Sequence, residues 1–270
     1  MNAMSFDRVF AIVLRQYYLL RGSPARVLPL FIWVAIDIVL WGFMTKYLNS
    51  IVAPGMGFVP AILGAIVLWD FFIRIMQGVT MAFFEDVWSR NFLNIFSTPM
   101  TIAEYVSGLV ASSVLTSSIG IVVMILLATL VFGLSFAVYG LMLVPAFLFL
   151  FLFGVAFGVI ACAMVLRLGP AAEWFIWPIP AMIAPFVGVF YPLKVLPVWM
   201  QTVGHLLPPS YIFEGMRAIV AGGTMPVMHI AAGGVLSVAY LLLACGFFTR
   251  TYHHALRTGL IARYSAENLG

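Results

Sequence analysis

The sequence predicts an all-α membrane protein with six transmembrane helices. Of its 270 residues, 64% are hydrophobic and only 8% carry a charge, whereas a soluble domain has about 25% charged residues. Such a chain cannot cover its surface with polar groups, so we expect the bilayer to be its solvent. A transmembrane helix needs about 20 apolar residues, and apolar runs of this length recur along the chain with short loops between them.

The first segment, residues 1–27, is predicted to be a cytoplasmic amphipathic interface helix. Its apolar residues recur at steps of three and four: Phe6, Phe10, Val13 and Tyr17. The charged residues lie elsewhere on the helical wheel. Such a helix can lie in the membrane interface with its cations turned toward lipid phosphates.

Residues 28–270 are expected to form one transmembrane domain. The predicted spans cover about 28–48, 58–83, 107–132, 140–166, 172–191 and 228–249. A polar segment at about 84–98 follows the second span and is predicted to hold a short helix. An external segment at about 195–222 separates the fifth and sixth spans.

Positive charge predicts the orientation. Six spans place both termini on one side, and the Lys and Arg residues of that side are Arg8, Arg15, Arg21, Arg26, Arg90, Arg167, Arg250, Arg257 and Arg263. The other side has Lys46, Lys194 and Arg217. Because cytoplasmic loops are enriched in Lys and Arg, we expect both termini to be cytoplasmic and the protein to lie in the inner membrane.

The external segment 195–222 is too apolar for a free loop and too rich in proline for a membrane span. Pro208 and Pro209 separate two stretches with helical character, because proline lacks an amide donor and disfavours helix in the residue before it. We therefore predict a re-entrant helical hairpin. Irregular backbone at membrane depth is tolerated where protein or a water-filled cavity covers it, so the hairpin is expected to cap a polar pathway.

Two motifs make the chain resemble the membrane subunit of an ABC-2-type exporter. The stretch "YPLKVLPVWMQTVGHLLPPSYIFEGMRAIVAGG", residues 191–223, has the family's Tyr-Pro, Leu-Pro-x-Trp and Glu-Gly-x-Arg elements. The stretch "EDVWSRNFLNIFSTPMTIAEYVSG", residues 85–108, resembles the family's coupling segment. Glu85, Thr98, Pro99 and Gly108 fit that pattern, but Ser89-Arg90-Asn91-Phe92 replaces its usual Gly-Thr-Leu.

The resemblance implies a homodimer that works with two separate ATPase subunits and exports a polysaccharide, lipid-linked glycan or drug-like amphipathic substrate. ATP and Mg²⁺ would bind the partner ATPase. The sequence has no G-x-x-x-x-G-K-[ST] phosphate loop, so we expect this chain to be no enzyme and to hold no cofactor. No Cys or carboxylate spacing joins its histidines into a metal site, so no metal is expected either. Membrane lipid is the other expected partner, and nucleic acid is not.

The predicted helix at 84–98 is the candidate contact with the ATPase. Trp88, Phe92 and Phe96 recur every four residues and would form its apolar anchor. The remaining candidates are the polar rim and the following turn: Glu85, Asp86, Arg90, Thr98 and Pro99. An interfacial helix without a partner is the alternative.

Several charged and aromatic residues are candidates for the pathway or its gates. Asp70 and Arg74 share one helix face and either form a structural ion pair or line the path. Asp37 has no partner within one turn and is the better pathway candidate, because charges inside a bilayer are costly. Glu173, at the start of the fifth span, is either a helix N-terminal carboxylate or an entrance gate. The outer candidates are Tyr191, Pro192, Tyr211, Glu214 and Arg217. Glu214 and Arg217 lie three residues apart, so either they pair with each other or one of them closes the outer mouth across the dimer axis.

An ion-coupled secondary transporter is the alternative function. It would use Asp37 and Asp70 as proton sites and would often contain an internal repeat, which the two halves of the sequence do not display. An intramembrane enzyme would need a catalytic set, and no local motif supplies one.

Overall fold

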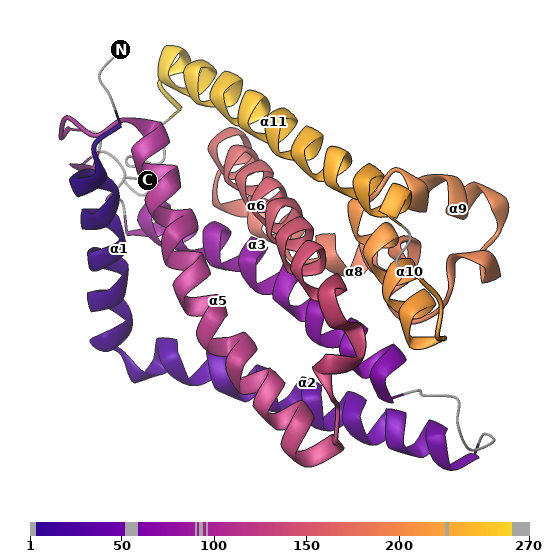
Figure 1. Ribbon diagram of the computed structural model, residues 1–270. Helices are drawn as coiled ribbons and strands as arrows, with labels where there is room; N and C mark the ends of the chain where they lie inside the picture. The colour runs from indigo at the N-terminus through magenta and orange to yellow at the C-terminus, as the bar shows by residue number, and fades with distance from the viewer. Residues whose placement is uncertain are drawn as a thin grey trace.

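The computed structural model describes residues 4–51, 59–89, 91, 94–95, 97–224 and 227–260. Within these ranges all regular structure is helical and no strand occurs. Among the described residues, five helices are long and apolar enough to cross a membrane. They are α2 (Pro24–Ile51), α3 (Gly64–Trp88), α5 (Ile102–Phe132), α6 (Leu143–Leu168) and α11 (Val227–Thr258), as Figure 1 shows.

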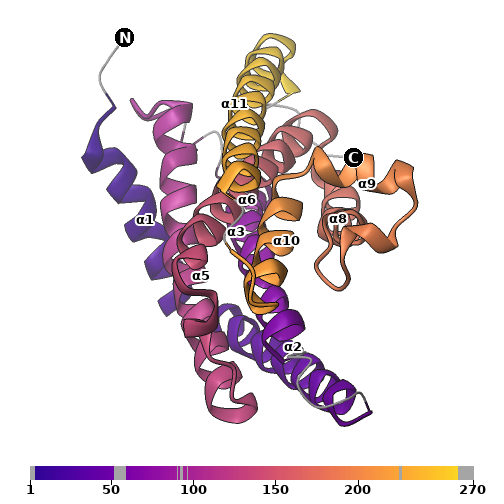
Figure 2. The same cartoon turned by 45° about the vertical axis from the view of Figure 1, so that its right-hand side comes forward.

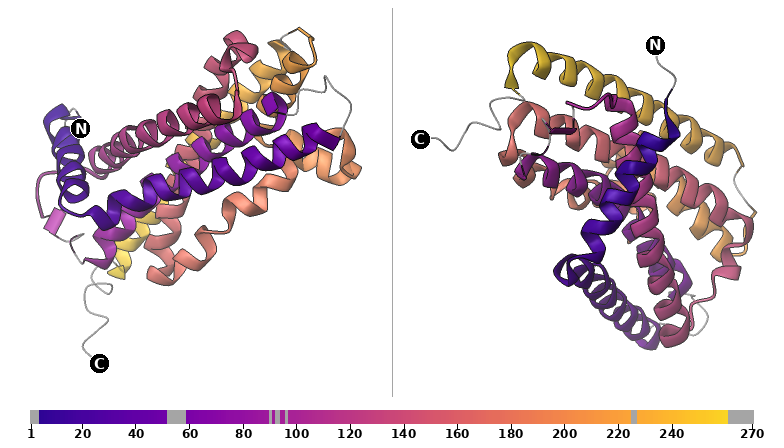
Figure 3. Two further views of the ribbon diagram at one scale, coloured as in Figure 1. Left: turned by 90° about the horizontal axis from the view of Figure 1, so that it is seen from below. Right: turned by 90° about the vertical axis from the view of Figure 1, so that its left-hand side faces the viewer.

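The shorter elements occupy the two ends of this bundle. α1 (Phe6–Arg21) lies across one end of the long helices, which we call the α1 end (Figure 3, right). The opposite end, which we call the α9 end, carries α9 (Val198–His205) and α10 (Pro208–Val220). Figure 2 shows α8 (Ile179–Val187) and α9 on the opposite side of α3 and α6 from α1 and α5.

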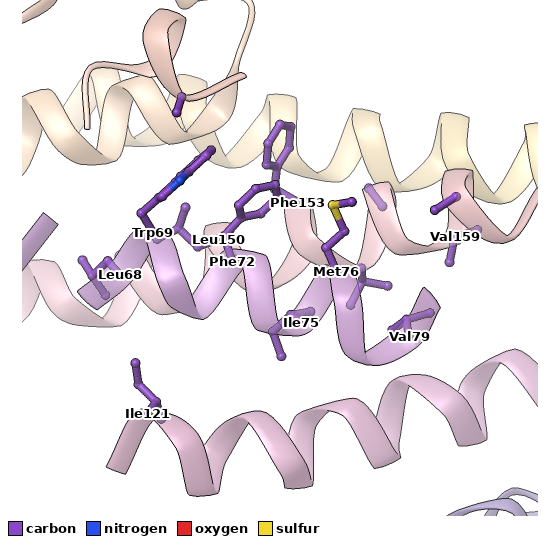
Figure 4. Packing of buried hydrophobic residues seen from close by; sticks show 14 of the residues in the cluster. Leu68, Trp69, Phe72, Ile75, Met76, Val79, Ile121, Leu150, Phe153 and Val159 are labelled. Carbon is purple, nitrogen blue, oxygen red and sulfur yellow. The ribbon is translucent and has the colours of Figure 1, made fainter. Parts of the chain in front are cut away.

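The core is built around α3. Its side chains Trp69, Phe72 and Met76 pack against Phe153 of α6, and the same row of contacts continues to Val79 (Figure 4). These residues are almost fully buried. Large apolar side chains from two parallel neighbours thus fill the centre of the bundle.

Small residues bring the helices close together. A Cβ atom on Gly154 of α6 would lie 2.9 Å from Ile75 of α3, and one on Gly78 would lie 2.3 Å from the Ser113 hydroxyl of α5. That hydroxyl donates a hydrogen bond of 2.9 Å to the carbonyl of Ile75. Small residues at contacts and hydroxyl bonds across them are typical of helix packing in membranes.

The predicted fifth span, 172–191, is wrong as a single helix. A short α7 (Glu173–Ile176) ends in a turn, α8 follows, and Gly188 stops α8 with a φ of 73°. Pro178 and Pro180 lie at the break, the first as the N-cap residue of α8 and the second in its first turn, whereas Pro185 lies inside α8. A proline removes a backbone donor and clashes with the preceding turn, so α7 does not continue through Pro178 and Pro180, and an apolar run of suitable length does not form one continuous helix.

The second predicted span also ends later than expected. α3 continues to Trp88, so the polar residues Glu85 and Asp86 belong to this helix and not to a separate helix that begins at 84. Asp86 is tolerated there because buried donors satisfy its carboxylate. The third long helix begins at Ile102 and not at 107, because Thr101 and Glu104 form a reciprocal capping box at its start.

Candidate functional site

At the α1 end, α1 is fixed to the bundle by two acidic residues. Asp86 at the end of α3 is fully buried and forms an ion pair with Arg15 of α1. Arg15 Nη1 donates to Asp86 Oδ2 over 3.0 Å, and Arg15 Nη2 donates to Oδ1. The Tyr105 hydroxyl of α5 donates to the same Oδ2 over 2.7 Å. One carboxylate therefore joins α1, α3 and α5.

The second acidic residue is Glu104 in the first turn of α5, which is 1% exposed. Its Oε2 accepts hydrogen bonds from Arg8 Nη1 at 3.1 Å and from the Thr101 amide at 2.8 Å. Its Oε1 accepts the Ser5 amide at 2.8 Å. Arg8 Nη1 also donates to the Pro99 carbonyl at 2.6 Å. We call Arg8, Arg15, Asp86, Glu104 and Tyr105 the α1 clamp.

The clamp corrects the expected orientation of α1. Arg8 and Arg15 were predicted to face lipid phosphates, but both point into the bundle toward carboxylates. The outward face of α1 instead carries exposed apolar and aromatic side chains: Phe6, Phe10, Leu14, Tyr17 and Tyr18. An ion pair with a buried acid holds these cations more specifically than a mobile lipid phosphate would.

The candidate ATPase-contact residues differ in their exposure. Asp86 is buried, so its predicted place on a polar rim is wrong. Trp88 is 46% exposed and stacks on Phe84 with ring centres 5.2 Å apart. Thr98 and Pro99 are exposed, and Glu85 is partly exposed. The other three candidates, Arg90, Phe92 and Phe96, lie outside the described residues.

Inside the bundle, Asp70 and Arg74 form an ion pair one turn apart on α3. Arg74 also lies against α5, because a Cβ atom on Gly120 would be 3.2 Å from Arg74 Nη1. Asp37 of α2 is partly buried and interacts electrostatically with Arg74 and Asp70. One turn beyond Asp37, Trp41 stacks on Phe190 with ring centres 5.0 Å apart. The three charged residues and two rings thus come from three separate segments.

The α9 end brings together most of the outer candidates. Glu214 Oε1 accepts a hydrogen bond from Arg217 Nη2 at 2.9 Å and one from the Leu193 amide at 2.8 Å. The Leu193 turn is preceded by Pro192, and the Tyr191 hydroxyl donates to the Pro185 carbonyl at 3.0 Å. Glu214 therefore ties α10 to the segment that follows α8.

Two contacts at the α9 end bring a neighbouring atom close to a glycine. Arg217 Nη2 lies 2.9 Å from where a Cβ atom on Gly188 would be, and its Nε is buried without a hydrogen-bond partner among the described residues. α9 rests on α8 so closely that a Cβ atom on Gly204 would lie 2.5 Å from the carbonyl oxygen of Phe186.

Two candidates stand apart from this group. The Tyr211 hydroxyl donates to the His205 carbonyl at 2.8 Å and so spans the turn between α9 and α10. Glu173 is the first residue of α7, and its side chain lies outside the described part of the structure.

Sequence reasoning missed Arg8, Arg15, Glu104 and Tyr105 as site residues. The capping-box spacing of Thr101 and Glu104 was readable from the sequence. The pairing of Asp86 with Arg15 was not readable, because 71 residues separate the two and no local pattern connects them.

These features define the chain as a multi-pass helical membrane protein with a buried ionic junction at one end of the bundle. The family model described as ABC-2 type transporter matches residues 9–221. The chain therefore belongs to the ABC-2 transporter family and is a membrane component of an ABC transporter, whose partner is an ATPase subunit. A search among curated proteins finds no matching relative.

Proposed function

We propose that this chain is the permease of an ATP-driven exporter that moves a glycan, lipid-linked or amphipathic substrate out of the cytoplasm. In this proposal two copies form the pathway, two ATPase subunits bind at the α1 end, and the chain itself binds neither ATP nor Mg²⁺. The protein lies in the inner membrane with both termini cytoplasmic.

The observation that carries the proposal is the α1 clamp. The end of α3, the first turns of α5 and Arg15 of α1 meet at the buried carboxylate of Asp86. A force applied at Trp88 or Pro99 would reach all three helices, because Pro99 also accepts a hydrogen bond from Arg8. Such a junction suits a permease that a separate motor moves from one end.

The proposal includes six crossings of the membrane. α6 runs in the same direction as α3, since Gly154 meets Ile75 and Gly158 meets Val79. α11 does the same, since Tyr240 meets Phe153 beside Phe72, and Phe248 meets Phe83. The chain must therefore return to the α9 end between α6 and α11. In this proposal the segment 172–191, which contains α7 and α8, makes the return. Trp177 lies beside Thr80 near the α1 end, and Phe190 contacts Trp41 in the half of α2 toward the α9 end.

The substrate class rests on the groups at mid-depth. Asp37, Asp70 and Arg74 offer hydrogen-bonding groups to hydroxyls or phosphates, and the stacked Trp41 and Phe190 offer apolar faces to sugar rings or alkyl chains. The bonds of Glu214 at the α9 end would keep the outer mouth closed until the two copies rearrange.

Reconstitution tests the energy source. The chain would be co-expressed with its ATPase, purified through a tag on the permease and placed in inside-out proteoliposomes with lipid-linked glycan. We expect the ATPase to co-purify and transport to require ATP, with no transport when the phosphate-loop lysine of the ATPase is replaced by alanine. Transport driven by a proton gradient without the ATPase would overturn the proposal in favour of the ion-coupled alternative.

Cysteine labelling tests the orientation. Trp88→Cys and Trp199→Cys would be made separately in a Cys245→Ser background, since Trp199 is 62% exposed at the α9 end. A membrane-impermeant thiol reagent applied to intact cells should label position 199 and spare position 88. Labelling of both from the same side would contradict the proposed topology.

A further inference from the structure

An apolar groove of about 660 Å³ opens on the surface of the bundle between α5, α6 and α11. One wall is the α5 stretch from Val106 to Leu115, the floor is formed by Phe151, Val155 and Val159 of α6, and Cys245 of α11 lies at the opposite side. The groove forms because α5 packs on α3 while α11 packs on α6. Its volume falls within the range of about 300–1,000 Å³ that holds small-molecule ligands.

The groove has the height of one membrane leaflet. At 1.5 Å per residue, the wall from Val106 to Leu115 extends about 14 Å along the helix, and half of a hydrocarbon core of about 30 Å is about 15 Å. The wall belongs to the half of α5 that starts beside Glu104 of the α1 clamp. The groove therefore opens into the leaflet on the α1 side.

Its lining is almost purely aliphatic and aromatic, with Ser107 as the hydroxyl-bearing residue of the wall. All three helices that border it are candidate membrane spans. A groove in that position faces alkyl chains and not water, and an apolar cavity of this kind does not hold ordered water.

Past the groove, the last turns of α11 carry exposed arginine side chains. α11 contains no acidic residue, and the turns beyond Cys245 carry two exposed arginines, Arg250 and Arg257, and two exposed histidines, His253 and His254. Long basic side chains at the ends of membrane helices extend to the lipid headgroups, and clusters of them attract anionic lipids.

We propose that this groove is a binding site for one anionic membrane phospholipid. One acyl chain lies along the α5 wall over Phe151 and Val155, and the phosphate-bearing headgroup lies at the basic end of α11. The lipid occupies the space between α5 and α11, so it holds the α1-clamped helix α5 at a fixed distance from α11. This site is independent of the exported substrate and of the ATPase.

Native mass spectrometry of the full chain tests the site, with phosphatidylglycerol and phosphatidylcholine as probes after delipidation. We expect the wild-type chain to retain one phosphatidylglycerol more tightly than one phosphatidylcholine. Leu115→Trp and Ala111→Leu fill the groove and should weaken that binding at least tenfold. The matched control is Leu126→Trp, which lies on the same face of α5 beyond the groove and is similarly exposed, at 52% against 57% for Leu115.

A second pair of substitutions tests the headgroup contact. Arg250→Gln with Arg257→Gln should abolish the preference for phosphatidylglycerol and leave the binding of one phosphatidylcholine in place. Equal lipid retention by Leu115→Trp and Leu126→Trp would overturn the proposal. A change from dimer to monomer in the groove variants, without a change in lipid count, would also overturn it and would assign the groove to a second copy of the chain. These readouts need no transport, so they remain decisive if the export proposal fails.

Discussion

Asp86 of α3 and Arg15 of α1 form a buried ion pair that closes across 71 residues of sequence. The carboxylate has no exposure, and its three donor contacts come from the two guanidinium nitrogens of Arg15 and the hydroxyl of Tyr105. A buried charge is tolerated when it is paired and hydrogen-bonded. The position of α1 on the bundle therefore depends on this carboxylate.

Asp86→Asn removes the charge and keeps the size of the side chain. It should lower the free energy of unfolding by about 3 kcal/mol, the low end for breaking a buried pair, because Arg15 retains some exposure. Thermal unfolding in detergent measures the change, and ATP-driven transport should fall with it. Asp7→Asn on the exposed part of α1 is the control and should be neutral. Equal behaviour of the two variants would show that Asp86 does not hold α1.

Tyr105→Phe tests one contact of the clamp without a change of volume. The variant loses only the hydroxyl that donates to Asp86, and a hydrogen bond to a charged group contributes about 1.5 kcal/mol or more. We expect a lower melting temperature and more rapid proteolysis of α1. Tyr47→Phe, whose ring is 61% exposed on α2, serves as the control. The combination of Tyr105→Phe with Asp86→Asn should cost less than the sum of the two, because both act on the same carboxylate.

Gly204→Ala tests the close contact between α9 and α8. A new Cβ atom would collide with the backbone carbonyl of Phe186, which cannot rotate away. We expect destabilisation by about 1–3 kcal/mol and leakage or loss of transport, because the α9 end would open. Gly246→Ala is the matched control, since that glycine is also helical but has open space around it. The control should be neutral or up to about 1 kcal/mol more stable, because alanine favours helix over glycine.

The sequence could predict most long helices, because their apolar length is a local property. Apolar length alone could not predict the break of the segment at 172–191, which occurs at Pro178 and is followed by the end of α8 at Gly188. The end of α3 was misplaced for the opposite reason. Asp86 looks like a surface residue in the sequence, and only the fold supplies the partners that allow its burial.

Contacts in the candidate site could be predicted where the two residues lie three or four positions apart in the sequence. The pairing of Asp70 with Arg74 followed from a spacing of four residues, and that of Glu214 with Arg217 from a spacing of three. The α1 clamp and the contact of Leu193 with Glu214 join distant segments. Such contacts are consequences of the tertiary fold, and a single sequence contains no local signal for them.

Substitutions in the ion pair of Asp70 and Arg74 distinguish the two candidate energy sources, ATP hydrolysis and a proton gradient. Asp70→Asn removes the carboxylate that pairs with Arg74 on α3, while Asp37 still interacts electrostatically with the guanidinium. The insertion scale for a charge at mid-membrane, about 2.5–3.5 kcal/mol, is therefore an upper bound for the cost. If the pair is structural, the double variant Asp70→Asn with Arg74→Gln removes both charges and should recover most of the stability.

ATP-driven transport should recover with stability in that double variant and should not depend on a proton gradient. The conservative single variant Asp70→Glu keeps the charge and should lie between the wild type and Asp70→Asn in melting temperature. A proton site at Asp70 predicts the opposite pattern, because the double variant would be stable and yet inactive. Stability and transport measured on the same preparations therefore decide whether Asp70 holds the bundle together or carries a proton, and the paired geometry at Arg74 leads us to expect the first result.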